Sequence, residues 1–102
     1  MPYQGLSDGE ITEQVRRLVS QGRIQWLPHA LSQMADRGIA KDQVKECLQV
    51  GYYEEPPTVP NRGGAIEYKF RMAAKVDGDQ LQVVASLVPD SKVIVITAFV
   101  LN

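Results

Sequence analysis

Three apolar runs rich in β-branched residues occupy the C-terminal part of this chain of 102 residues. They read GAIEYKFRMAAKV, LQVVASLV and VIVITAFVLN, and the turn-forming clusters DGDQ and PDSK separate them. Apolar runs of this length joined by short turn clusters are typical of an antiparallel meander. We therefore expect strands at about 65–76, 81–88 and 93–101, and the rest of the chain must cover the sheet that they form.

Side chains alternate between the two faces of a strand, so the pairing of the strands decides which residues share a face. The pairs expected across the two turns are Met72 with Ala85, Arg71 with Ser86, Val84 with Thr97, and Ser86 with Val95. The apolar face would carry Ile66, Tyr68, Phe70, Met72, Ala74, Leu81, Val83, Ala85, Leu87, Ile94, Ile96, Ala98 and Val100. The opposite face would carry Glu67, Lys69, Arg71, Lys75, Val84, Ser86, Val95, Thr97 and Phe99. The first face must be buried, and chemistry is expected on the second.

The first half of the chain has the period of amphipathic helices. Ser7 and Glu10 form a capping-box pattern, and Pro28 suits the first position of a helix. We predict helices at about 8–21, 28–37 and 40–50, an edge strand at 52–55, and a surface loop rich in proline and glycine at 56–64. Helices followed by strands indicate a single α+β domain over 1–102, with the helices packed on one face of a three- to four-stranded antiparallel sheet.

Composition narrows the functional classes. The formal net charge of −1 argues against a large non-specific surface for nucleic acid, although a local basic patch remains open. A single cysteine, Cys47, excludes an internal disulfide and fits a reducing cytoplasm. No apolar run approaches the roughly 18 residues that span a bilayer, and no secretory signal is visible. With one histidine and one cysteine, the sequence predicts neither a metal site nor a cofactor.

His29 is the side chain whose ordinary pKa lies nearest neutrality, which makes it the natural general acid or base. It precedes Arg37 by eight residues, so both fall on one side of the second predicted helix. A substrate could bridge the two side chains. The alternative is that His29 bonds to local backbone in the first turn of its helix.

Lys69 and Arg71 project from the same face of one strand, and Ser86 and Thr97 share that face on the next two. Such a surface could bind a phosphodiester and stabilise charge that develops on phosphorus. The alternative is a set of solvated charges on the exposed face of an antiparallel sheet, where Glu67 could neutralise the cations.

Several strings in the sequence resemble a small bacterial domain family. They are WLPHALSQMADRGIA, VKECLQVG and VIVITAF, and they run from about Trp26 to Val100. The family shows a histidine-alanine, an arginine-glycine-isoleucine about eight residues later, a helix with valine, leucine and glycine, and a closing strand with valine-isoleucine-threonine. It is similar to the RelE/BrnT-like toxins of the barnase-EndoU-colicin-RelE ribonuclease fold class.

This resemblance implies N-terminal helices on a twisted antiparallel sheet and a metal-independent ribonuclease. Cleavage would proceed by attack of the ribose 2′-hydroxyl on the adjacent phosphate. The resemblance makes His29 the general acid or base, while Arg37, Lys69 and Arg71 hold the phosphate and Thr97 hydrogen-bonds to it. The implied partners are RNA and a cognate antitoxin-like protein.

Two other functions are compatible with the same sequence. The protein could be a non-catalytic interaction module that binds a protein or RNA through the polar face of the sheet. It could also form a homodimer, with Val84, Val95 and Phe99 as the contact, because exposed hydrocarbon of that extent often marks an interface.

Overall fold

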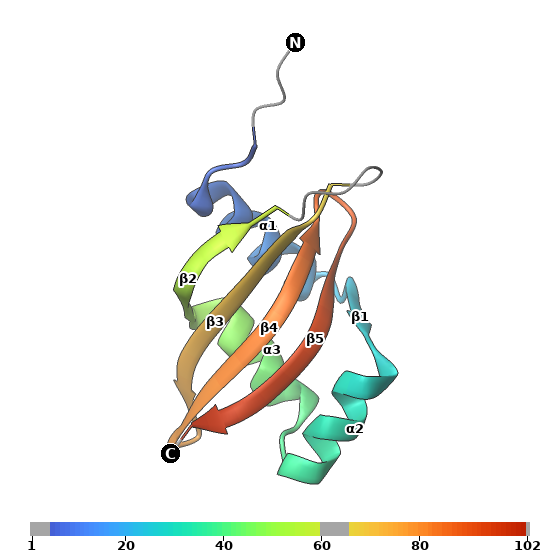
Figure 1. Cartoon of the computed structure of the whole chain (residues 1–102), viewed down its shortest axis with the longest axis vertical. Coiled ribbons are helices and arrows are strands. Elements are labelled where there is room, and N and C mark those ends of the chain that lie inside the picture. The colour runs from blue at the N-terminus through green and yellow to red at the C-terminus, as the bar shows by residue number, and fades with distance from the viewer. Residues whose placement is uncertain (1–4, 60–65, 102) are drawn as a thin grey trace.

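The computed structural model describes residues 5–59 and 66–101 and has an α+β architecture (Figure 1). The helices are α1 (Asp8–Ser20), α2 (Pro28–Arg37) and α3 (Lys41–Val50). The strands are β1 (Ile24–Trp26), β2 (Tyr52–Thr58), β3 (Tyr68–Val76), β4 (Asp79–Val88) and β5 (Lys92–Leu101). Helices α1 and α3 lie behind the sheet in Figure 1, whereas α2 lies beside β5 at its edge. The predicted α+β class and the three predicted helices are confirmed.

Local sequence signals fix the ends of the helices. The Ser7 side chain accepts a hydrogen bond from the backbone N–H of Glu10, and the Glu10 carboxylate accepts one from the N–H of Ser7. This capping box holds the start of α1. Pro28 begins α2, and Gly38 ends it with a φ of 69°, a left-handed conformation that glycine adopts without a steric penalty. Within residues 5–59 and 66–101, none of the helices has the length and apolar character needed to cross a bilayer.

The sheet has five strands in the order β1-β5-β4-β3-β2, so the prediction of three to four antiparallel strands was wrong in number and in one orientation. The additional strand is β1, which pairs in parallel with β5, with Ile24 opposite Val93 and Trp26 opposite Val95. The sequence pattern assigned no strand to these residues. Three residues are too few to show a strand period, so their pairing depends on the neighbouring strand rather than on their own pattern.

The first turn of the meander is tighter than predicted. Val76 pairs with Asp79, so only Asp77 and Gly78 form the turn, and both have positive φ values of 51° and 86°. Two consecutive residues of this kind are the signature of a two-residue hairpin turn. Arg71 therefore lies opposite Val84 and not Ser86, and Met72 lies opposite Val83 and not Ala85. Because the register differs by two residues, the predicted faces of β3 and β4 are preserved.

In β5 an irregularity reverses part of the predicted face. Val84 pairs with Thr97 as predicted, but Ala85 pairs with Val95, so the register shifts by one residue between the two pairs. Ser86 consequently lies opposite Ile94 rather than Val95. An extra residue in one strand turns the side chains on one side of it to the other face. Val95 is therefore fully buried instead of lying on the polar face, and Ile94, predicted in the core, is partly exposed.

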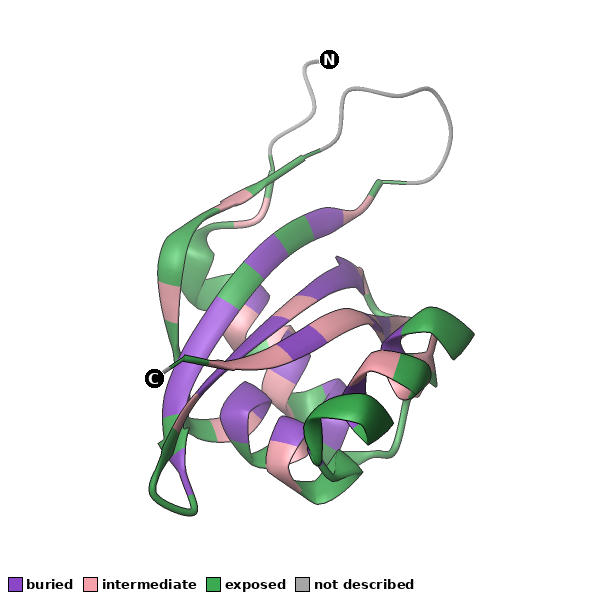
Figure 2. Cartoon of the chain, turned by 60° about the horizontal axis from the view of Figure 1, so that its bottom comes forward, coloured by how far each residue is buried: buried purple, intermediate pink, exposed green. Residues whose placement is uncertain are grey.

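The core lies between the sheet and the helices α1 and α3, where the buried positions cluster (Figure 2). From α1 and α3 it takes Ile11, Val15, Leu18, Val19, Val44, Cys47 and Leu48. From the meander it takes Tyr68, Phe70, Met72, Ala74, Val76, Leu81, Val83, Ala85, Leu87, Val93, Val95 and Ala98. Ile66 was predicted in this set but is 38% exposed. Most of the predicted apolar face of the sheet is thus confirmed as the core.

The segment predicted as a surface loop at 56–64 is described only in part. Pro56, Pro57 and Thr58 belong to β2, so this strand continues past the predicted end at residue 55. Residues 60–64 of the predicted loop, residue 65 at the predicted start of β3, and the C-terminal residue 102 lie outside the described residues.

Cys47 is expected to be chemically inert in the folded protein. Its side chain is fully buried, with Sγ 3.6 Å from the carbonyl oxygen of Met72, and burial raises the thiol pKa from 9.0 to about 12. Between these values the unfolded chain loses the thiol proton while the folded chain keeps it, so stability falls as the pH rises, by about 1.4 kcal/mol per pH unit. Urea unfolding across this pH range measures the slope.

The matched control is Cys47→Ala, which removes this titration and should flatten the slope by that amount. Alkylation offers a second measurement. Iodoacetamide should leave the native protein unmodified near neutral pH and label it in concentrated guanidinium chloride. Rapid labelling of the native protein would contradict the buried position.

Candidate functional site

The face of the sheet opposite α1 and α3, here called the outer face, carries one row of residues across four strands. The pairings place Glu55 of β2 beside Arg71 of β3, Arg71 beside Val84 of β4, and Val84 beside Thr97 of β5. We call these four residues the central row. Neighbouring strands lie about 4.8 Å apart, so the backbones of Arg71 and Thr97 are separated by about 10 Å. A small ligand on the outer face can therefore contact Arg71, Val84 and Thr97, which come from three neighbouring strands.

Helix α2 contributes to the same row from the edge of the sheet. The Arg37 guanidinium donates through Nη1 to the carbonyl oxygen of Ala98 at 2.8 Å and lies 3.4 Å from the Thr97 hydroxyl oxygen. The Thr97 hydroxyl in turn donates to the side-chain oxygen of Gln33. Gln33 and Arg37 are four residues apart, so both project from one side of α2 toward β5. These contacts extend the central row to a second arginine.

Beside the central row lies a second row that the pairings define as Thr58, Lys69, Ser86 and Ile94. Lys69 is exposed, whereas Ser86 is only 5% exposed. The Ser86 hydroxyl donates to the Glu67 carboxylate at 2.9 Å. Glu67, which the sequence suggested as a counter-ion for the cations, is thus hydrogen-bonded to serine, and Lys69 is the cation of this row.

Arg71 has a carboxylate neighbour. Its Nη1 lies 3.7 Å from Oε1 of Glu55, and the two side chains are 43% and 71% exposed. An ion pair of this exposure contributes between 0 and about 1 kcal/mol. A phosphate group accepts charge-assisted, bidentate hydrogen bonds from a guanidinium, which are stronger. Glu55 therefore does not prevent Arg71 from binding an anion.

His29 lies in the first turn of α2 and is exposed. Helical rise places it about 6 Å along the axis from Gln33 and about 12 Å from Arg37. Among the residues that the structure describes, no hydrogen bond or ion pair ties its imidazole to a neighbour. The described residues therefore do not include the hydrogen bond from His29 to local backbone that was the alternative prediction. The ring is accessible to a ligand.

The structure thus groups four of the five predicted site residues on one face. Arg37, Thr97 and Arg71 belong to or contact the central row, and Lys69 stands in the adjacent row. His29 lies about two helical turns from Arg37, next to the edge of the sheet. Within the described ranges, no three histidine, cysteine, aspartate or glutamate side chains lie close enough together to hold a metal ion.

Two residues of this face were not among the predicted site residues. Helical i+4 spacing places Gln33 on the same side of α2 as His29 and Arg37, but no role in the site was predicted for it. Glu55 could not be found, because its pairing with Arg71 lies between two register shifts that the sequence does not reveal. The predicted homodimer contact also changes: Val84 and Phe99 are partly exposed, but Val95 is buried in the core and cannot contribute.

The fold and the site define a small α+β domain with a polar, cationic face on its sheet. Residues 26–100 match the family model described as "Domain of unknown function (DUF4258)", so the chain belongs to this family. The matched residues begin at β1 and end in β5, and α1 precedes them. Every member of the two rows lies within the family's span.

No curated protein and no solved structure matches this chain significantly.

Proposed function

We propose that the protein is a metal-independent ribonuclease, similar in mechanism to RelE/BrnT-like toxins, that holds an RNA phosphodiester on the outer face of its sheet. The observation that carries the proposal is the central row. Arg71 and Thr97 share this row through Val84, and Thr97 is hydrogen-bonded to Arg37. Lys69 adds a third positive charge from the next row. Three cations from two elements around one patch suit a single phosphate group.

The reaction balances without an external reagent other than the RNA. The 2′-oxygen of the ribose forms a bond to the adjacent phosphorus, and the bond from phosphorus to the 5′-oxygen of the next nucleotide breaks. The 2′-hydroxyl proton leaves to a general base, and the 5′-oxygen receives a proton from a general acid. The products are a 2′,3′-cyclic phosphate and a free 5′-hydroxyl.

In this proposal the cations stabilise the negative charge that builds on the non-bridging oxygens in the transition state. Arg71 and Lys69 approach from the sheet, and Arg37 approaches from α2. Arg37 uses Nη1 on Ala98 and Thr97, which leaves Nη2 and Nε to donate to the phosphate. Thr97 directs its proton to Gln33, so its main contribution is to hold Arg37 beside the row.

His29 supplies the proton transfer. Its imidazole is exposed at the edge of the sheet, on the flank of α2 that also presents Gln33 and Arg37. The general base must reach the ribose whose 3′-phosphate the cations hold, so the proposal places this ribose between Arg37 and the start of α2, within reach of the imidazole directly or through one water. General acid–base catalysis of this kind typically accelerates a reaction by about 10² to 10⁴.

The second candidate function is binding without cleavage, with RNA or an antitoxin-like protein as the partner. It is favoured by the accessibility of His29, for which no orienting hydrogen bond is found in residues 5–59 and 66–101. Catalytic bases usually have a partner that fixes the ring. The same outer face would then serve as a docking surface, and an acidic partner would complement its cations.

The deciding experiment incubates the full chain with a single-stranded RNA and with a DNA of the same sequence, with and without EDTA. We expect cleavage of the RNA alone, insensitivity to EDTA, and 2′,3′-cyclic phosphate ends in the mass spectrum. Arg71→Gln should slow cleavage by at least about tenfold. Arg17→Gln, a change to an exposed arginine that pairs with Asp90, should not slow it. Intact RNA that nevertheless binds would favour the second candidate.

A further inference from the structure

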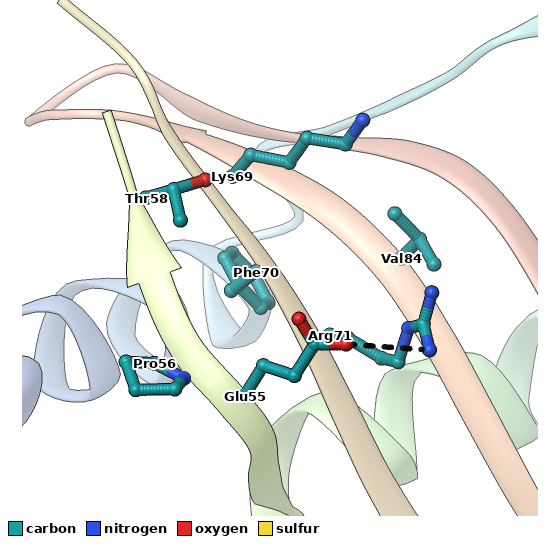
Figure 3. Close-up of a pocket in the computed structure, with 7 residues that line it drawn as sticks. All are labelled: Glu55, Pro56, Thr58, Lys69, Phe70, Arg71 and Val84. Atoms are coloured by element: carbon teal, nitrogen blue, oxygen red, sulfur yellow. Dashed lines mark ion pairs between the residues drawn. The ribbon is translucent and has the colours of Figure 1, made fainter. Parts of the chain in front are cut away.

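A hollow opens on the outer face between β2 and β3, because these strands do not pair regularly. The register shifts once between Tyr53 and Glu55 and again between Glu55 and Thr58. The intervening residues Pro56 and Pro57 have no backbone N–H to donate to β3, so the ladder is interrupted there. The hollow is lined by Glu55, Pro56, Thr58, Lys69, Phe70, Arg71 and Val84 (Figure 3).

The hollow has the size of a single ring system. Its volume is about 220 Å³. A water molecule occupies about 30 Å³ in the liquid, so the space far exceeds a single ion or water. It is also smaller than the roughly 300–1,000 Å³ of pockets that enclose a complete cofactor or drug-sized ligand. The volume therefore suits one planar or compact group.

Its lining combines apolar walls with charged groups of both signs. Pro56 and Val84 provide hydrocarbon. Phe70 lies beneath the hollow in β3, and its ring belongs to the core, where it packs edge-on against Tyr53 with a centroid distance of 6.0 Å. In Figure 3 the Arg71 side chain extends from β3 toward Val84, and the Glu55 carboxylate faces it across the mouth of the hollow. Lys69 projects from the same strand. The cations Lys69 and Arg71 thus lie next to apolar side chains in the same hollow.

We propose that this hollow binds the base of an RNA nucleotide whose phosphate is held by Lys69 and Arg71, which makes it the base subsite of the ribonuclease proposed above. A nucleobase can contact both the apolar and the charged residues of the lining. Its flat faces suit the hydrocarbon of Pro56 and Val84, and its ring N–H or amino groups can donate to the Glu55 carboxylate. An acidic peptide would satisfy the two cations but would face repulsion from Glu55 and leave the apolar wall uncovered.

The test compares three small ligands by ¹H–¹⁵N NMR titration of the full chain: uridine 3′-monophosphate, adenosine 3′-monophosphate and ribose 5-phosphate, which has no base. We expect at least one nucleotide to bind about fivefold to a hundredfold more tightly than ribose phosphate. The largest shifts should involve Thr58, Phe70 and Val84. Thr58→Trp fills the hollow and should remove this preference, while Tyr52→Trp on the same strand, outside the lining, should preserve it.

The outcomes separate the subsite from the ribonuclease. If all three ligands bind equally and shift Lys69 and Arg71 alone, the base subsite is overturned while phosphate binding and the proposed function remain. If none binds and RNA stays intact, both are overturned. A glutamate-rich peptide that binds more tightly than the nucleotides, in a manner blocked by Thr58→Trp, would assign the hollow to a protein partner instead.

Discussion

Replacing His29 with alanine is expected to lower the rate of RNA cleavage by about 10² to 10⁴. The side chain is exposed in the first turn of α2 and contributes nothing to the core, so the melting temperature should not change measurably. Affinity for an uncleavable 2′-O-methyl RNA should also be preserved, because the phosphate contacts belong to Arg37, Lys69 and Arg71. Single-turnover kinetics with saturating protein measure the loss.

The matched control for this substitution is Ser32→Ala, a change to an exposed position on the same helix. It should leave the rate unaltered. Full activity of His29→Ala would contradict the assignment of His29 as the general acid or base.

Gly51→Ala is expected to cause the largest loss of stability, about 3 kcal/mol. Gly51 connects α3 to β2, and a Cβ added there would lie 2.4 Å from the carbonyl oxygen of Cys47 and 2.8 Å from that of Ala73. Both oxygens belong to backbone, so no side chain can rotate away to relieve the contact. The melting temperature should fall by more than about 10 °C in a domain of this size. Calorimetry or thermal circular dichroism measures the difference.

Gly9→Ala is the control for this prediction. It lies in the first turn of α1, where an added Cβ would meet only the Ser7 hydroxyl oxygen, at 3.9 Å. Alanine favours the helix over glycine, so this change should raise stability by up to about 1 kcal/mol. Equal changes in stability for the two substitutions would show that the carbonyl oxygens of Cys47 and Ala73 leave room for a Cβ at residue 51, which contradicts the prediction.

The helices were predictable because their signals are local. A capping box at Ser7, a proline at the start of α2 and a glycine at its end specify boundaries within a few residues. The faces of β3 and β4 were predictable for the same reason, since alternation depends only on neighbouring positions. The register between β3 and β4 could not be predicted in this way. The sequence offers Asp77-Gly78 as a two-residue turn, but the polar residues Asp79 and Gln80 extend the apparent turn and displaced the predicted pairing by two.

The error in β5 has a different cause. Its sequence VIVITAFV is apolar on both faces, so an extra residue leaves no mark on the pattern. The register shift between Val84 and Ala85 becomes visible only from the pairing with β4. It buries Val95 and leaves Thr97 on the outer face, opposite Val84. The predicted pair of Val84 and Thr97 was right because it lies beyond the shift.

Part of the candidate site could be assembled from the sequence. Lys69 and Arg71 share a face by simple alternation, and Arg37 shares a flank of α2 with His29 by helical spacing. The position of α2 against β5 could not be derived, because it depends on how the chain leaves β1, a three-residue strand without its own period. The contact from Arg37 to Thr97 and Ala98 follows from that position.

The most direct test of the outer face as a phosphate-binding surface is the salt dependence of affinity for a single-stranded 2′-O-methyl RNA. Each phosphate neutralised contributes about −0.7 to the slope of log K against log salt concentration, so one phosphate held by the three cations predicts a slope of about −0.7. Arg37→Gln, Lys69→Gln and Arg71→Gln should each weaken binding and bring the slope nearer to zero, and Arg17→Gln should change neither the affinity nor the slope. A slope near zero, or the same reduction in Arg17→Gln, would contradict the assignment of this face to RNA.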